Sequence, residues 1–228
     1  MNSLLSAAFD GQMLSEYGSG LLTTLYLTLA CALVSYLIGI PVGVLLSVTD
    51  KDGIRPNKLV NTVVGFLVNV LRSIPFVILL VVALPFTKLL VGTKVGDTAF
   101  LVPLILSAAP FVARMVESSL KEVDKGVIEA AHSMGSTDMQ IILKVLLPEA
   151  KPSLLVGGAI AVTTILGYTP LATLVGGGGL GAIAVQYGLY RFNYPVMYIA
   201  SILIIILVQI LQELGLRLAK RSDKRISR

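Results

Sequence analysis

The stretch GVIEAAHSMGSTDMQIILKVLLPEAKP, residues 126–152, is the longest polar-bearing segment of an otherwise apolar chain. Its apolar residues Val127, Ala131 and Met134 recur at helical spacing, which predicts a short amphipathic helix with its polar side chains turned away from them. Gly135 follows directly, and a glycine can take the positive φ that ends a helix. We therefore expect this helix to stop at a sharp turn at Gly135.

A second helix is predicted to begin after this turn. Thr137 and Gln140 have the spacing of a capping box. Apolar residues at positions 141, 142, 145 and 146 give the second helix one apolar face, and Pro148 is expected to interrupt it. Two interpretations suit this pair: an exposed helix that a soluble partner grips, and an ordinary interfacial loop lying on a bilayer. Periodicity alone favours the interfacial loop.

The composition outside this stretch is that of an integral membrane protein. Of 228 residues, 55% are hydrophobic and only 14% are charged, whereas soluble domains have about 25% charged residues. Several uncharged stretches exceed the ~20 residues that a helix needs to cross a bilayer core. These runs are continuous, whereas barrel strands would alternate apolar and polar residues. The sequence therefore predicts an all-α membrane protein.

Five transmembrane helices are expected along the chain. Their approximate ranges are 21–48, 59–86, 98–120, 153–175 and 194–216. The second is broken by Arg72-Ser73-Ile74-Pro75, and the four glycines at 176–179 end the fourth. An irregular loop is expected between the fourth and fifth. The first 20 residues contain no Lys or Arg, so they lack the basic start of a signal peptide and are expected to be retained.

The positions of Lys and Arg predict the orientation in the membrane. Five spans place the two termini on opposite sides. The segments 50–58, 121–151 and 217–228 together contain 13 basic residues, and the segments on the opposite side contain 3. Because basic residues favour the cytoplasmic side, the N-terminus is predicted outside and the C-terminus in the cytoplasm, together with the opening stretch. This placement explains the basic residues without nucleic-acid binding.

The sequence offers no catalytic or metal-binding set. His132 is the only histidine and Cys31 the only cysteine, and neither has a metal-ligand neighbour at useful spacing. No Asp falls inside a predicted span, which argues against an intramembrane protease. The run at 176–181 lacks the Lys-Ser/Thr of a phosphate-binding loop, and we interpret it as a flexible outer cap. Because no ATP site is visible, energy would have to come from another chain.

Two groups of polar residues are candidates for a passage through the membrane. Arg72, Ser73 and Pro75 could shape a bend near it, although Arg72 could instead extend toward the cytoplasm or be held by helix-terminal carbonyls. In the fourth span the candidates are the hydroxyl-bearing residues Thr163, Thr164 and Tyr168. Ordinary hydrogen bonding between helices explains these hydroxyls equally simply, and the periodicity favours it.

Arg114 and Glu117 are three positions apart at the end of the third span, so they lie on one helical face. A simple ion pair is the favoured interpretation. Because they lie where the third span leads into the stretch 126–152, a role in transmitting movement between this stretch and the span stays open.

Six positions of the opening stretch carry a family resemblance. The residues Glu129-Ala130-Ala131, Gly135 and Leu147-Pro148 resemble the EAA loop of ABC importer permeases, which docks on the ATP-hydrolysing subunit. Val145 departs mildly from the pattern, which usually has Ile there. The resemblance favours the interpretation that a soluble partner grips this loop.

From about residue 42 onward, the chain resembles the permease subunit of methionine-import ABC transporters, the type I kind with five helices. The matching strings are NVLRSIPFVILL, LPFTKLLVGT, AAPFVARMVESSL, EAAHSMGSTDMQIILKVLLPEA and VGGGGLGAIAVQYG. The resemblance implies an extracytoplasmic segment over 1–18, an ABC transmembrane type-1 domain over 19–216 with a docking loop at 121–152, and a basic cytoplasmic tail over 217–228.

The resemblance also implies partners and a function. It implies a homodimer in a bacterial cell membrane, two cytoplasmic ATPase subunits that bind ATP and Mg²⁺, and an extracytoplasmic substrate-binding protein or lipoprotein. This chain itself would hold no cofactor and would not be an enzyme. Alternating access would import L- or D-methionine. The alternatives are a permease for another small solute such as a polar amino acid, a passive channel, and a membrane enzyme.

Overall fold

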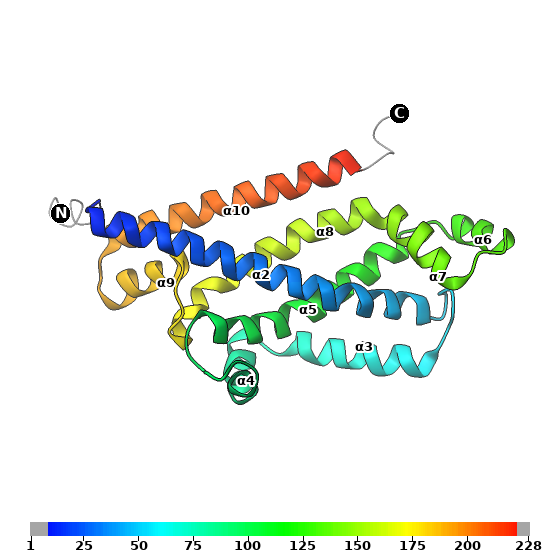
Figure 1. Ribbon diagram of the computed structural model, residues 1–228, viewed down its shortest axis with the longest axis horizontal. Coiled ribbons are helices and arrows are strands. Elements are labelled where there is room, and N and C mark those ends of the chain that lie inside the picture. Colours follow the sequence, from blue (N-terminus) through cyan, green and yellow to red (C-terminus); the bar gives the residue numbers. More distant parts are fainter. Residues whose placement is uncertain (1–8, 223–228) are drawn as a thin grey trace. The chain divides into compact units, whose positions relative to one another are not determined.

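A computed structural model describes residues 9–222 of the chain, and within that range the regular structure is entirely helical (Figure 1). The elements are α2 (Gly11–Thr49), α3 (Lys58–Ser73), α4 (Phe76–Val91), α5 (Asp97–Lys121), α6 (Lys125–Ser133), α7 (Asp138–Ile141), the π-helical η1 (Ile142–Leu146), α8 (Leu147–Tyr168), the 3₁₀-helical η2 (Thr169–Val175), α9 (Leu180–Val185), the π-helical η3 (Gln186–Tyr190) and α10 (Tyr194–Ser222).

The long helices agree with the five predicted spans. Among the described residues, four helical stretches are long and apolar enough to cross a membrane: α2, α5, the stretch Asp138–Val175 and α10. Helices α3 and α4 pass the same test only as a bent pair, which makes the number of candidate spans five if the pair counts as one span. Large apolar side chains remain exposed along α2, α3, α4 and α10, as expected for helices that face lipid.

The second span is a bent pair of helices, as the predicted break at Pro75 suggested. Helix α3 begins at its N-cap Asn57, whose side chain accepts a hydrogen bond from the Val60 amide. It ends because Ile74 is extended, with ψ of 121°, the conformation that a residue before proline prefers. The chain bends there by 110° before α4 continues. The break predicted within 59–86 is therefore confirmed, and the second of the two helices continues beyond the predicted end to Val91.

Several predicted boundaries also change. Helix α2 begins at Gly11 rather than near residue 21 because Tyr17 packs against Val196 and Ala200 of α10 and so extends the helix. Helix α10 continues to Ser222, so the start of the predicted basic tail is helical. The rest of that tail, at 223–228, and the first eight residues of the predicted N-terminal segment lie outside the described residues.

The predicted irregular loop after the fourth span is largely helical. Gly176, with φ of 66°, ends η2 as predicted, but the chain then forms α9 and η3 before α10. Gly181 allows this because a Cβ there would lie 2.5 Å from the Pro170 Cα, so the two backbones pack at glycine distance. Close backbone packing thus produces helix where the sequence suggested a loop.

The prediction that Pro148 interrupts the second helix of the opening stretch is wrong. Helical structure continues from α7 through η1 into α8, and Pro148 is the second residue of α8. The Leu147 amide donates to the Ile142 carbonyl, a π-type bond that widens the turn before the proline. A proline can follow such a turn without ending the helix, because the wider turn accommodates both the missing N–H and the ring of the proline.

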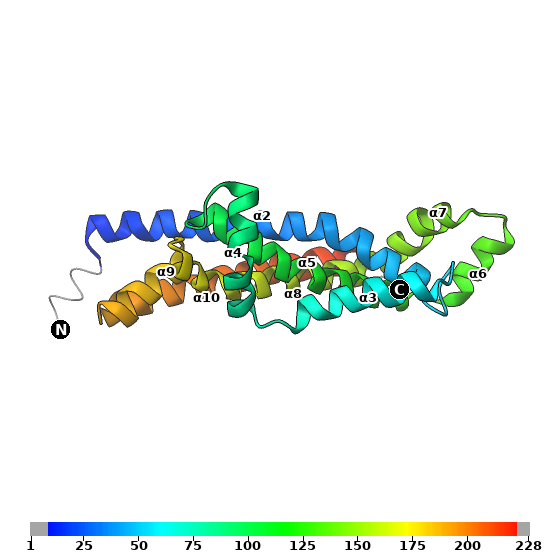
Figure 2. The same cartoon turned by 90° about the horizontal axis from the view of Figure 1, so that it is seen from below.

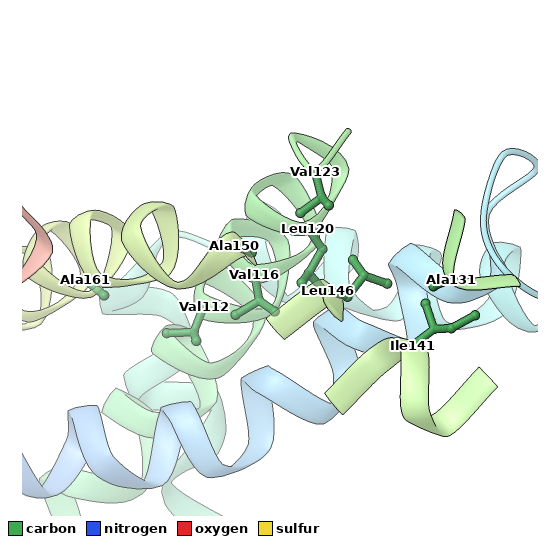
Figure 3. Packing of buried hydrophobic residues seen from close by; sticks show 9 residues of the cluster. All are labelled: Val112, Val116, Leu120, Val123, Ala131, Ile141, Leu146, Ala150 and Ala161. Carbon is green, nitrogen blue, oxygen red and sulfur yellow. The ribbon is translucent and has the colours of Figure 1, made fainter. Parts of the chain in front are cut away.

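The described chain divides into two compact units, which we describe separately. Unit 1 comprises residues 9–33, 75–106 and 162–211, and unit 2 comprises 34–74, 107–161 and 212–222. In unit 1, Phe76 packs edge-on against Phe100 and is stacked on Tyr168. Unit 2 has a contiguous apolar core from α5, α6, α7, η1 and α8, shown in Figure 3. Its buried members are Val112, Val116, Leu120, Val123, Ala131, Ile141, Leu146, Ala150 and Ala161.

Candidate functional site

Helix α6 is the first half of the predicted docking loop and belongs to unit 2. Its N-cap is Asp124, whose carboxylate accepts a hydrogen bond from the Gly126 amide at 2.6 Å. Its end is set by Gly135, which has φ of 79° and donates its amide to the His132 carbonyl. The helix stop predicted at Gly135 is confirmed. Figures 1 and 2 show α6 joined to α7 by the short loop that this glycine begins.

The buried face of α6 differs from the predicted one. Ala131 is buried at 3% exposure, as predicted. Ile128, which was not predicted on this face, packs against the core of unit 2. Val127 and Met134, which were expected to share that face, are 44% and 80% exposed. The correction has a physical reason: in a nine-residue helix several faces are partly apolar, and the neighbouring core selects the one that fits. An apolar strip is left open on the other side.

The structure places each of the six residues that carry the resemblance to the EAA loop. Glu129 and Ala130 of α6 are exposed, Ala131 is buried, and Gly135 supplies the turn. Leu147 packs against the core of unit 2 and the adjacent Pro148 is exposed. These six residues therefore lie on one helix–turn–helix segment, with Ala131 and Leu147 anchoring it to the same core.

The predicted capping box starts α7. The Gln140 amide donates to the Thr137 hydroxyl at 3.4 Å, and the Thr137 amide donates to the Gln140 side chain at 3.0 Å. Ile141 is fully buried and takes its place beside Ala131 in the core (Figure 3). This part of the sequence analysis is confirmed in detail.

A cavity of about 400 Å³ separates α6 from the turn between α2 and α3. One stripe of α6 lines it: Lys125, Ile128, Glu129 and His132, at the spacing of successive helical turns. The opposite wall comes from the turn and the end of α5 and consists of Ser47, Val48, Asp50, Asp52, Gly53, Ile54, Leu120 and Lys121, closed by Val123 and Leu146. Helix α6 thus turns Lys125, Glu129 and His132 toward the cavity, whereas Val127 and Met134 are exposed.

An ion network lies at the base of the loop, at the end of α5. The predicted pair is confirmed, since Arg114 Nη1 donates to Glu117 Oε2 at 2.6 Å. Lys121 Nζ lies 2.8 Å from the other oxygen of Glu117 and 2.6 Å from Asp50 Oδ2. Glu117 is buried, at 6% exposure, so two cations compensate one buried carboxylate. The hydrogen bond from Lys121 holds the pKa of the Asp50 carboxyl below its ordinary value.

Arg114 extends the network to α3. Its Nη2 donates to the Gly65 carbonyl at 3.1 Å and to the Asn69 side-chain oxygen at 2.9 Å. The network therefore joins α5 to α3 and to the turn after α2. Sequence analysis found the Arg114–Glu117 pair and missed Asp50 and Asn69. Asp50 had a signal, because the predicted topology places it and Lys121 on the same side of the membrane.

The candidate passage residues are divided between the two units, so each is described within its own unit. Arg72 is exposed in the last turn of α3, where a cation suits the helix dipole, and Ser73 donates its hydroxyl to the Asn69 carbonyl. Both belong to unit 2, whereas the other four candidates belong to unit 1. Of these, Pro75 is the N-cap of α4, Tyr168 stacks on a phenylalanine ring, and Thr163 and Thr164 of α8 are half-buried.

The glycine run after η2 is held by hydrogen bonds, which corrects its interpretation as a flexible cap. The Gly178 amide donates to Asp97 Oδ1 at 2.7 Å, and the Leu180 amide donates to the Thr24 hydroxyl at 2.9 Å. The Gly177 amide donates to the Ala172 carbonyl at 2.9 Å. The run is therefore fixed to α2, α5 and η2 within unit 1. Over residues 9–222, no cluster of three His, Cys, Asp or Glu suits a metal ion.

Comparison with known proteins identifies the family to which the chain belongs. The family model described as "Binding-protein-dependent transport system inner membrane component" matches residues 39–228. The chain belongs to this family. The match includes the end of α2 from residue 39, the whole helix–turn–helix segment of α6 and α7, and every other helix that follows α2, so it covers parts of both units.

Individual relatives in this transport family are similar over most of their length. A probable D-methionine transport system permease protein of Vibrio cholerae is 47% identical over 202 residues, covering 89% of this chain and 90% of that protein. A methionine import system permease protein of Bacillus subtilis is 46% identical over 181 residues, covering 79% of this chain and 82% of its own length.

Solved structures of the same transport class share the fold. An inward-facing structure of the MetNI methionine ABC transporter matches with a TM-score of 0.92 at 44% identity, covering 95% of this chain and 100% of that one. An amino acid ABC transporter matches with a TM-score of 0.76 at 21% identity, covering 92% and 95%. The second likeness concerns the fold alone. The chain therefore has the type I ABC importer permease fold and is a transporter component rather than an enzyme.

Proposed function

We propose that this chain is the membrane-spanning permease subunit of an ATP-driven importer and that the imported solute is methionine, in the L form, the D form or both. One observation carries the proposal: 47% identity to a methionine permease over 89% of this chain. The relatives from Vibrio and Bacillus have the same substrate in their names. The proposal includes a multi-pass position in a bacterial cell membrane.

In this proposal α6 is the docking helix for a separate ATPase subunit. Three features of α6 support the assignment. Val127 and Met134 form an exposed apolar strip that a partner could bury, Glu129 and Ala130 are accessible beside it, and Gly135 fixes the exit of the chain. The 13-to-3 distribution of basic residues supports a cytoplasmic location for this helix, where an ATPase binds ATP and Mg²⁺.

The working assembly would contain two copies of this chain, two ATPase subunits and an extracytoplasmic substrate-binding protein or lipoprotein. ATP binding would draw the two ATPase subunits together and move the two α6 helices with them. Because Ala131 and Leu147 anchor the loop to the core of unit 2, this movement would reach α5 and α8. The spans would then alternate between inward-open and outward-open states. Arg72, Ser73, Pro75, Thr163, Thr164 and Tyr168 stay as proposed passage residues.

Reconstitution tests the function directly. The chain is inserted into liposomes with its ATPase and its binding protein, and uptake of labelled L- and D-methionine is measured with and without ATP. ATP-dependent methionine uptake that unlabelled polar amino acids do not compete away is the expected result. Uptake of a polar amino acid in preference to methionine would contradict the substrate assignment, and uptake without ATPase would contradict an ABC importer.

A further inference from the structure

The turn between α2 and α3 (residues 50–57) is built as a rigid element. The Arg55 amide donates to the Val48 carbonyl at 3.0 Å and the Asn57 amide to the Thr49 carbonyl at 2.9 Å. Gly53 packs so closely that a Cβ there would lie 2.4 Å from the Val48 carbonyl oxygen. Backbone contacts of this kind leave little freedom, so the turn moves as one piece with the end of α2.

Helix α3 is tied to the same turn. The Asn61 side-chain amide of α3 donates to the Leu46 carbonyl at 2.8 Å and to the Thr49 hydroxyl at 3.3 Å. The end of α2, the turn and the first part of α3 are therefore one hydrogen-bonded body. On its other side this body meets α6: Ile54 packs on the core that contains Ala131, and Lys125 lies 3.9 Å from Asp52.

This body contacts α5 in two ways. Gly43 of α2 packs so closely on α5 that a Cβ there would lie 2.5 Å from the Ala113 carbonyl oxygen. At the end of α5 the contact is electrostatic and comes from Lys121. Lys121, the last residue of α5, reaches Asp50 at 2.6 Å while its other bond holds the buried Glu117 at 2.8 Å. From Glu117 the network continues through Arg114 to the Gly65 carbonyl on α3. The network thus joins α5, which leads directly into α6, to the rigid turn and to α3.

We propose that Asp50 and Lys121 are positioning residues for energy coupling, and that Glu117 and Arg114 hold Lys121 in place. The proposal rests on the proposed function, in which α6 moves with an ATPase. A displacement of α6 pulls on the end of α5. With the Lys121–Asp50 contact formed, the turn, α2 and α3 follow α5. Without it, only apolar packing joins the end of α5 to the turn and α2, the end of α5 can shift relative to the turn, and ATP is hydrolysed with less solute moved.

The test compares transport per ATP in the complete reconstituted transporter. Asp50→Asn is the central variant, because it removes the tie to the turn and leaves Lys121 paired with Glu117. Asp50→Glu restores the charge at nearly the same place. Glu213→Gln is the matched control, because it breaks an ion pair of the same kind, 2.7 Å from Arg217, on the exposed surface of α10.

The expected result is a fall of at least about fivefold in methionine moved per ATP for Asp50→Asn, the lower range of measured couplings between sites. Asp50→Glu should return the ratio to within about twofold of wild type, and Glu213→Gln should leave it unchanged. Co-purification of the ATPase with each variant reports assembly, and it should be equal.

Either of two outcomes overturns the proposal: an unchanged ratio in Asp50→Asn, or an equal loss of transport and ATP hydrolysis, which would indicate a structural role alone. The wild-type vesicles separate this result from the proposed function. If wild type fails to import methionine with ATP, the function assignment is wrong, whereas normal wild-type uptake with a normal Asp50→Asn ratio contradicts only the role of the network.

Discussion

In unit 2 the segments around the proposed docking loop are joined by charged groups, whereas in unit 1 the segments around the glycine run are joined by single hydrogen bonds to backbone amides. Unit 2 has Arg114, Glu117, Lys121 and Asp50 in one chain of contacts. Unit 1 has Asp97 accepting from the Gly178 amide. The first arrangement joins side chains of separate elements, and the second depends on glycine backbones that approach closely.

This difference predicts how each region responds to change. Long side chains can keep an ion pair through small movements of the helices that carry them, which suits a region that transmits motion. Glycine contacts have no such tolerance, because a single added methyl group must displace backbone atoms. We expect charge-removing substitutions to affect coupling in unit 2 and size-increasing substitutions to affect stability in unit 1. The following predictions test that contrast.

The largest effect is expected for Gly135→Pro at the end of α6. Proline fixes φ near −65°, whereas Gly135 has φ of 79°, and proline also removes the amide that donates to His132. ATP-driven uptake should fall at least about tenfold, the equivalent of ~1.4 kcal/mol, while the protein still inserts into the membrane. Gly18→Ala, at a helical glycine with nothing within 4 Å, is the control. If Gly135→Pro transports at the rate of wild type, α6 has no role in the mechanism.

Glu117→Gln should lower thermal stability. Removing one partner of a fully buried ion pair costs ~3–5 kcal/mol, and we expect about 2 kcal/mol here because Lys121 is 45% exposed and solvent screens it. The melting temperature in detergent should drop by several degrees. It is measured with a thiol-reactive or other extrinsic dye, because the chain has no tryptophan. A melting temperature equal to that of wild type would mean that Glu117 contributes nothing to the network.

Within the glycine run, two neighbouring alanine substitutions should differ. Gly181→Ala places a Cβ 2.5 Å from the Pro170 Cα, and overpacking of this kind costs ~1–3 kcal/mol. Gly178→Ala finds its nearest atom at 3.6 Å, an ordinary contact, and should be tolerated. Melting temperatures of the two variants measured side by side decide the matter, and equal values would contradict the packing described for unit 1.

The smallest effect is the pH dependence of the Asp50 contact. The Lys121 hydrogen bond lowers the pKa of Asp50 below the ordinary value of 3.8. A carboxyl with a depressed pKa stabilises the fold above its unfolded-state value and loses that contribution as pH falls through its folded-state value. The stability difference between wild type and Asp50→Asn should therefore be constant from about pH 6 to 8 and decline only below about pH 4. A decline near neutral pH would contradict the Asp50 carboxylate as the source of the difference.

Local signals in the sequence were sufficient for part of the fold. The end of α6 at Gly135 and the start of α7 at Thr137 follow from backbone freedom and side-chain caps, which depend on neighbours in the chain. The five spans follow from long uncharged runs. The Arg114–Glu117 pair follows from helical spacing. Each of these features is set within a few residues.

The features that sequence analysis missed depend on distant contacts. The contact between Asp50 and Lys121 joins residues 71 positions apart and needs the packing of α2 against α5. The continuation of the helix through Pro148 needs a π-helical turn that no local rule announces. The exposure of Val127 and Met134 depends on which face of α6 fits the core. Propensity gives such a helix its place in the chain, and tertiary packing decides its orientation.

The most direct measurement for the central claim is the accessibility of α6 from each side of the membrane. Met134→Cys introduces a thiol at an exposed position, and the natural Cys31 is buried, so the parent chain is the unlabelled control. A membrane-impermeant maleimide should label Met134→Cys in inverted vesicles, not in right-side-out vesicles, and bound ATPase should protect it. Labelling from the outside, or labelling that the ATPase does not reduce, would contradict the assignment of α6 as a cytoplasmic docking helix.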